Sequence, residues 1–455
     1  MIGRRSLLLA GAALPASVSA YGQCVTDVAA VDACFGGVRL TVPQGATLDL
    51  NFLAAPLDPR ITFTRASTAT YFDATGTMQT AAINAPRWDY DPVTHALRGL
   101  LLEDQGTNGV RNSTDISAVV PGTPGTAPAN WAYNAGPTGL TVQTVGAGVE
   151  SGIPYVDIRF FGTVGTAGGS ALITDTATAI VAATGQTWTG SIYWRIIAGS
   201  ANGLTTSSLS LRENTSAGAL VRDNPVTLAN PANASLSAQR IAATVALSGG
   251  ATTARVQARY TNNFSAGAAV DVTIRVGGPQ VEQSPAVTSF IPTTTAAVTR
   301  NIDSCLIPSA NMAWFTSPGG SWFAEFMFMA PAPSNSRIIG RPDTVGGVSP
   351  YLLAATRTGA QNDGASVATT NAGTAIAITK GASAWAAGQA KVCLNGGPVA
   401  SGAALATGYG VFTTSGVRFM SVGAALSTDN TSGWLRRVAY WPRVLTDAEM
   451  LSMTA

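Results

Sequence analysis

Apolar and polar residues alternate with a period of two in many short segments of this 455-residue chain. In one of them the bulky apolar residues Trp188, Ile192 and Trp194 share one parity, and Tyr193 and Arg195 occupy the other. Successive side chains of a strand point to opposite faces, so this segment predicts a strand with one face in a core. Further alternating or apolar runs, separated by glycine, asparagine and proline, cover residues 155–160, 207–212, 254–260 and 270–276. This spacing predicts an antiparallel β-sandwich.

The C-terminal third of the chain predicts a second sandwich. Residues 321–329 are apolar on both parities, as a buried central strand requires. Beyond residues 433–445, Thr446 is a natural helix N-cap, and Glu449 three residues later completes a capping box. We therefore expect one short helix at this end of an otherwise all-β chain.

These patterns predict an all-β fold of tandem antiparallel β-sandwiches after a small N-terminal β region; the jelly-roll type is what the resemblance given below implies. Residues 121–128 are rich in proline and glycine and can continue neither a helix nor a central strand, so they indicate a domain boundary or an exposed loop. Single cores rarely grow beyond about 250 to 300 residues, so several domains are expected. The predicted units are an N-terminal segment and linker, a small β-rich region and two sandwiches, at 1–50, 51–125, 126–298 and 299–455.

Charge and motif content argue against nucleic-acid binding and against catalysis. Charged residues make up 11% of the sequence and the net charge is +2, which gives no basis for a phosphate-binding surface. His95 is the single histidine, so most of the chain lacks the usual general base. Carboxylate pairs such as Glu103 with Asp104, or Asp157 with Glu213, belong to no hydrolase motif. We expect that the protein is not an enzyme.

Three punctuated blocks follow one another in the first quarter of the chain. They are 65–71, 86–92 and 98–103, the last followed by Thr107 and Asn108. The blocks resemble those of bacteriophage tail-fibre and virion-appendage proteins, although Gly109 and Val110 stand where the family usually has an apolar pair. The resemblance implies a binding protein on the surface of a virus-like particle. Within the second block, we expect Arg87 to pair with Asp89 or Asp91 at the protein surface.

Two further resemblances concern the sandwiches. Residues 277–283, followed by 288–293, resemble the last strand and exit loop of carbohydrate-binding-module-like jelly rolls of phage fibres. Residues 433–450 resemble the terminal strand and helix of concanavalin-A-like and laminin-G-like lectin domains. Together the resemblances imply a tail fibre or head spike that attaches a virion to host cell-surface polysaccharide, as a homo-oligomer for which a trimer is favoured by analogy. Lectin-like sandwiches often hold calcium, but Asp429 with Asn430 is too small a set of ligands, so no cofactor is expected.

The first twenty residues have the three parts of an export signal. Arg4 and Arg5 precede the apolar run 7–14, and small residues follow as far as Ala20. The apolar run is too short for a permanent membrane-spanning helix, so no membrane association is expected. The competing interpretation is a peptide that attaches the protein to other virion proteins. The preferred localisation is the virion surface, and the alternative is a secreted or periplasmic protein.

The four cysteines have no zinc-binding spacing. We prefer the pairings Cys24 with Cys34 and Cys305 with Cys393, because each bridge would lie within one predicted domain. Free buried thiols are the alternative.

Glycan binding requires aromatic faces for sugar CH surfaces, and polar side chains for hydroxyl groups. The candidates lie in a presumed loop at 260–264, on the non-core parity of the strand at 187–197, and in the last domain. They are Tyr193, Arg195, Tyr260, Asn262, Asn263, Phe264, Trp385 and Asn395. For each, a role in the core or in a turn is the commoner one. The alternatives to attachment are a structural decoration or connector protein of a virion, and an exported bacterial protein that binds or cleaves glycans.

Overall fold

The computed structural model describes residues 43–134, 136–316, 319–329, 336–340, 351–354, 358–362, 365–369, 377–386, 389–402, 416–422 and 431–455. The chain divides into two compact units, 1–46 and 47–455, and the second is described below. Its described residues form antiparallel sheets, with a short α-helix as the only α-helix among them. The predicted all-β fold with tandem sandwiches is confirmed. The export-like segment, Cys24, Cys34, Asp429 and Asn430 lie outside the described residues.

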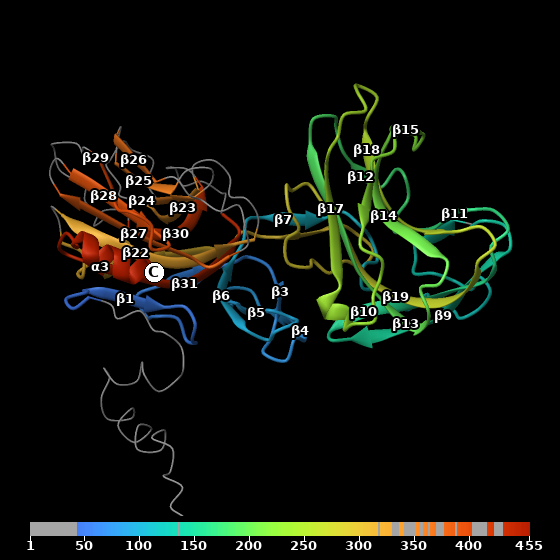
Figure 1. Cartoon of the computed structure of the whole chain (residues 1–455), viewed down its shortest axis with the longest axis horizontal. Helices are drawn as coiled ribbons and strands as arrows, with labels where there is room; N and C mark the ends of the chain where they lie inside the picture. The colour runs from blue at the N-terminus through green and yellow to red at the C-terminus, as the bar shows by residue number, and fades with distance from the viewer. Residues whose placement is uncertain are drawn as a thin grey trace, which may run out of the picture. The chain divides into compact units, whose positions relative to one another are not determined.

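The first sandwich packs a five-stranded sheet against a seven-stranded sheet (Figure 1). The five-stranded sheet runs in the order β17 (Arg240–Ala246), β13 (Thr187–Gly199), β19 (Ala269–Glu282), β10 (Ile153–Thr163) and β9 (Leu140–Glu150). The other contains β15 (Leu220–Arg222), β14 (Leu204–Asn214), β18 (Arg255–Phe264), β11 (Gly168–Ile173) and β8 (Ala132–Asn134), with β12 (Ile180–Val181) on β18 and β16 (Pro225–Leu228) on β14. The edge strands β9 and β8 follow one another in the sequence.

The parity predicted for residues 187–197 is confirmed. Trp188, Ile192 and Trp194 are buried in the core between the two sheets. Tyr193 faces the other side of the five-stranded sheet, where it is buried in a second, smaller apolar cluster with Phe290. That cluster also contains Met78 of β4 (Met78–Ala81), which forms a hairpin with β3 (Ala69–Phe72). This face is therefore covered at one end.

The second sandwich pairs an eight-stranded sheet with a seven-stranded sheet. The first contains β29 (Ala400–Gly402), β28 (Gln389–Leu394), β27 (Thr379–Ala386), β22 (Gly320–Phe328), β31 (Gly433–Trp441), β6 (Leu97–Leu102) and β5 (Trp88–Tyr90), with β1 (Leu48–Asn51) on β31. The second runs β2 (Thr62–Thr64), β21 (Ser304–Ile307), β30 (Val417–Val422), β23 (Ser336–Gly340), β24 (Tyr351–Ala354), β25 (Thr358–Asn362) and β26 (Ala365–Thr369). The predicted helix is α3 (Asp447–Thr454), and its capping box between Thr446 and Glu449 is confirmed.

Strands from the β-rich region at 51–125 belong to these same sheets. Leu100 of β6 pairs with Leu435 of β31, and Phe63 of β2 pairs with Cys305 of β21. Figure 1 shows β1, near the start of the described chain, beside β31 near its end. A further ladder joins β7 (Gly106–Asn108) to β20 (Val298–Arg300). The domain bounds stay a prediction, but the region at 51–125 builds its sheets jointly with the last part of the chain.

The preferred bridge between Cys305 and Cys393 does not form, because both are buried free cysteines. Cys305 lies in the core of the second sandwich. On β28, Val392 and Leu394 point into that core, so Cys393 between them points away from it. Its Sγ lies 3.1 Å from Thr454 Oγ1 of α3. The two thiols therefore lie on different faces of their sheets.

Among the residues that the structure describes, no helix has the length and apolar character needed to cross a membrane.

Candidate functional site

The presumed loop at 260–264 is part of strand β18, which corrects the sequence interpretation. Tyr260 and Phe264 point into the core of the first sandwich, and the Tyr260 hydroxyl donates to the Ser191 carbonyl at 2.8 Å. Asn262 shares their parity and accepts a hydrogen bond from Ser207 at 2.9 Å. Cross-strand partners thus satisfy a stretch whose asparagines are typical of turns.

Asn263, on the outer parity of β18, donates to Thr206 Oγ1 at 3.1 Å. In the second sandwich, Trp385 is buried in the core, with its ring centroid 6.1 Å from that of Tyr440. Asn395 has a positive φ of 44° and closes the turn after β28, where its Oδ1 accepts from the Lys380 backbone N–H at 2.8 Å. Trp385 and Asn395 thus occupy the core and turn roles that were the alternatives to binding, whereas Asn263 is a strand residue bonded to the neighbouring strand.

Tyr193 and Arg195 share the outer face of the five-stranded sheet, but they differ in access. Tyr193 is buried and borders a small cavity of about 390 Å³. Arg195 is half-buried and donates to Glu150 at 2.8 Å and to Asn233 at 3.0 Å. Since Glu150 also pairs with Arg275 at 2.7 Å, the Arg195 guanidinium is already part of an ion-pair network. The eight predicted residues do not gather into one site.

Arg87 is also placed differently from the prediction. Its side chain is fully buried and pairs with Asp303 at 2.6 Å and with Glu103 at 2.8 Å, not with Asp89 or Asp91 at the surface. Burial alone would raise the pKa of Glu103, but Arg300, Arg87 and the hydrogen bonds from Ser289 lower it to about 2. Glu103 is therefore held as a buried carboxylate with fixed partners.

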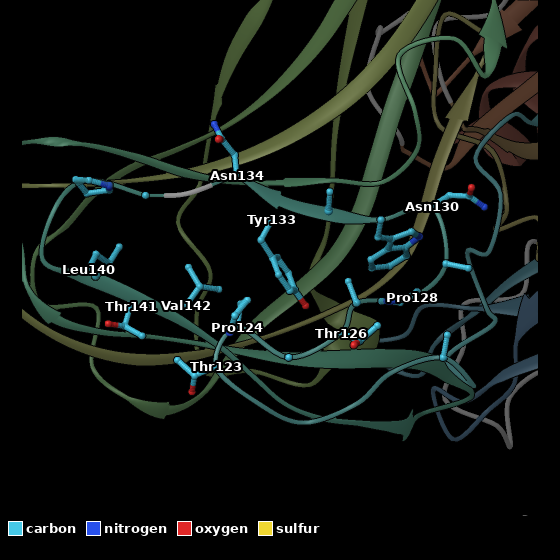
Figure 2. Close-up of a pocket in the computed structure, with 18 of the residues that line it drawn as sticks. Thr123, Pro124, Thr126, Pro128, Asn130, Tyr133, Asn134, Leu140, Thr141 and Val142 are labelled. Atoms are coloured by element: carbon cyan, nitrogen blue, oxygen red, sulfur yellow. The ribbon is translucent and has the colours of Figure 1, made fainter.

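A cleft of about 830 Å³ lies in the first sandwich (Figure 2). It lies where β8 and the start of β9, the edge strands of the two sheets, leave the seam of the sandwich open. Tyr133 of β8 projects toward the loop that carries Pro124 and Thr126, whereas Asn134 points the other way. Leu140 and Val142 contribute apolar surface from β9. Because β8 and β9 are edge strands, the cleft opens toward the core between the two sheets.

The Pro/Gly-rich stretch at 121–128 forms one wall of the cleft. Thr144 of β9 fixes this wall, because its backbone N–H donates to the Pro124 carbonyl at 2.8 Å and its hydroxyl donates to the same oxygen at 2.7 Å. Gly122 and Thr144 also exchange a pair of backbone hydrogen bonds. The turn between β8 and β9 requires Gly139, whose φ is +81° and where a Cβ would lie 2.1 Å from the Thr163 carbonyl. The stretch expected as a boundary is thus an ordered part of the cleft.

The cleft has an aromatic wall and an uncharged polar rim. Trp131 is buried, and Tyr133 is half-buried with its hydroxyl 3.4 Å from Thr144 Oγ1. Burial raises the pKa of Tyr133, so its hydroxyl stays protonated at neutral pH. The hydroxyls of Thr123 and Thr126 have no hydrogen-bond partner within the described part of the chain. None of the described residues that line the cleft carries a charge.

Sequence reasoning missed the cleft, although local signals were present. Trp131 and Tyr133 are two aromatic residues directly after a Pro/Gly/Thr-rich stretch. The sequence pattern does not show that β8 and β9 are edge strands of two different sheets. The described residues contain no group of three or more histidine, cysteine, aspartate or glutamate side chains arranged to hold a metal ion.

No protein-family model matches the chain, and no curated protein sequence matches it. Solved structures with some similarity include a Trypanosoma rangeli sialidase, at 14% identity and a TM-score of 0.27 over 33% of this chain and 25% of the sialidase. An α-L-arabinofuranosidase, MgGH51, is 14% identical with a TM-score of 0.26 over 49% of this chain and 31% of that one. The tandem CBM22 domain of Paenibacillus barcinonensis Xyn10C is 10% identical with a TM-score of 0.22 over 74% and 93%. The chain spans about a quarter of the first of these proteins. At such TM-scores the similarities carry no functional argument.

Proposed function

We propose that this chain is a non-catalytic glycan-binding protein and that the cleft between β8 and β9 holds the sugar. The observation that carries the proposal is the combination of a half-buried tyrosine with unengaged hydroxyl groups on an uncharged rim. Sugars present CH faces that pack on aromatic rings, and hydroxyl groups that need small polar partners. Tyr133 offers the first kind of contact, and Thr123, Thr126 and Asn130 offer the second.

Binding, and not cleavage, fits the chemistry of the cleft. Glycoside hydrolysis generally uses two carboxyl groups roughly 5 to 9.5 Å apart. The described lining residues include no carboxylate. Elsewhere, Asp157 is in an ion pair with Arg275 at 2.8 Å, and Glu213 accepts hydrogen bonds from the backbone N–H groups of Ser248 and Gly249. Asp157 and Glu213, one of the two carboxylate pairs considered from the sequence, are therefore engaged in structural contacts.

The three blocks at 65–103 support a place on a virion, by resemblance to tail-fibre and appendage proteins. In that setting the chain attaches the particle to host cell-surface polysaccharide. Weak contacts in single clefts would gain avidity from several copies of a homo-oligomer. The signal-like pattern at 1–20 favours one other candidate, an exported bacterial protein that binds glycans through the same cleft.

The test is binding of the purified full chain to host cells and to cells stripped of capsule, with reducing-sugar release followed in the same tubes. We expect capsule-dependent binding without release. Thr126→Ala should weaken this binding, whereas Thr227→Ala, at an exposed threonine of β16 in the same sandwich, should not. Equal binding to stripped cells would refute the glycan proposal, sugar release would refute the non-catalytic one, and equal effects of the two variants would move the site elsewhere.

A further inference from the structure

A chain of hydrogen bonds connects the rim of the cleft to a carboxylate. Asn130 lines the cleft, and its Nδ2 donates to Asn112 Oδ1 at 2.6 Å. Asn112 in turn donates from Nδ2 to Asp115 Oδ2 at 3.5 Å. Asn112 is held in place by its backbone N–H, which donates to the Thr294 carbonyl. The three side chains thus form a hydrogen-bond relay in which Asn130 donates to Asn112 and Asn112 donates to Asp115.

The carboxylate at one end determines which way both amides point. An ionised carboxylate can only accept hydrogen bonds, so Asn112 must present its NH₂ group to Asp115. Hydrogen bonds from Ser117 lower the pKa of Asp115 and keep it ionised at neutral pH. With both amides reversed, Asn112 Oδ1 would face Asp115 Oδ2, which would bring two acceptors together. Asn130 therefore uses its NH₂ group within the relay and keeps Oδ1 unengaged, as an acceptor.

We infer that this relay makes the cleft selective for uncharged glycans over uronate-, phosphate- or sulfate-bearing ones. The inference rests on the proposed function. A sugar hydroxyl can donate to Asn130 Oδ1, whereas deprotonated acidic groups are acceptors only. The cleft offers them no cation, since the nearby Arg111 is outside the lining and is bound to Asp175 at 2.6 Å. An anion that exchanges water for uncharged partners alone loses solvation that those partners replace only in part.

The experiment uses an array of neutral hexose oligosaccharides beside the same backbones oxidised at C6 to uronic acids. The purified full chain should bind the neutral members. It should bind their acidic counterparts with an affinity lower by roughly tenfold, as expected for one unmatched polar contact. Asp115→Asn should reduce that difference, because an amide at 115 can donate as well as accept and frees the relay to reverse. Asp271→Asn, which removes the same charge from an exposed pair with Arg159 on β10, should leave the difference unchanged.

The outcomes separate this inference from the proposed function. Equal or stronger binding to the acidic members would overturn the charge selectivity and leave glycan binding standing. A preference for neutral members that Asp115→Asn and Asp271→Asn alter equally would show that general charge, and not the relay, is responsible. Binding to no array member would overturn both proposals. Asn130→Gly should weaken neutral binding without backbone strain, because φ at this position is +67°.

Discussion

Arg87 Nη2 lies 2.6 Å from Asp303 Oδ2, although 216 residues separate the two and neither side chain is exposed. Arg65 binds the other carboxylate oxygen of Asp303 at 3.0 Å. Glu103 pairs with both Arg87 and Arg300, at 2.8 and 2.9 Å. Arg65, Arg87 and Glu103 come from the three blocks that resemble appendage proteins, while Arg300 and Asp303 lie at the start of the second predicted sandwich. The blocks thus form a buried ionic cluster instead of a binding surface.

Removing a carboxylate from this cluster should be strongly destabilising. In Asp303→Asn, the buried guanidinium groups of Arg65 and Arg87 lose their shared counter-charge. Breaking a buried ion pair from one side typically costs about 3 to 5 kcal/mol. We expect a loss of this order in the free energy of unfolding, measured by urea denaturation. Asp271→Asn, which breaks an exposed pair, is the control and should have little effect. Similar losses in both variants would contradict a special role for the cluster.

Glu103 should make the cluster sensitive to acid. Its pKa is lowered to about 2 from an ordinary value of 4.5, so its contribution to stability is full above about pH 4.5 and is lost as the pH falls toward 2. Burial raises the pKa of Asp89 and of Glu282, which act in the opposite sense. The comparison of wild type with Glu103→Gln isolates the first effect. We expect the difference in unfolding free energy between them to shrink by roughly 3 kcal/mol across that range. A difference independent of pH would refute this assignment.

Alanine substitutions at two glycines test whether the turn between β8 and β9 depends on the close approach of Gly139 to the Thr163 carbonyl. Gly139 and Gly185 have nearly equal φ values, +81° and +84°, but only Gly139 would place a Cβ against backbone, at the Thr163 carbonyl. Gly185→Ala should cost about 1 to 2 kcal/mol from the left-handed conformation alone. Gly139→Ala should cost more in urea denaturation, because the turn must also shift. It should weaken binding at the cleft as well. Equal losses in the two variants would mean that the turn adapts freely.

The thiols of Cys305 and Cys393 should be free in the native protein. Burial raises the pKa of both, so slow alkylation is expected while the chain is folded. The protein is denatured in the absence of reductant and then alkylated. Mass spectrometry of its peptides should find both residues labelled. A disulfide-linked peptide containing Cys305 and Cys393 would contradict the structure. The same samples would report on Cys24 and Cys34.

Several elements could be predicted from the sequence because their determinants are local. The parity of Trp188, Ile192 and Trp194 follows from the geometry of one strand, and the core placement agrees with it. The capping box of Thr446 and Glu449 needs only one turn of helix. The sequence by itself therefore determined the all-β class, the core faces of strong strands and the terminal helix.

Tertiary structure alone decided the partners and the site. From the sequence, Asn262 looks like a turn residue. In the structure the hydroxyl of Ser207, 55 positions away on the neighbouring strand β14, donates to its side-chain oxygen. From the sequence, Arg87 looks like a surface residue, but in the structure it forms a buried ion pair with Asp303. The cleft exists because β8 and β9, adjacent in sequence, are the edges of two different sheets. Sheet order and long-range ion pairs depend on the packing of the whole chain, and no local period or spacing encodes them.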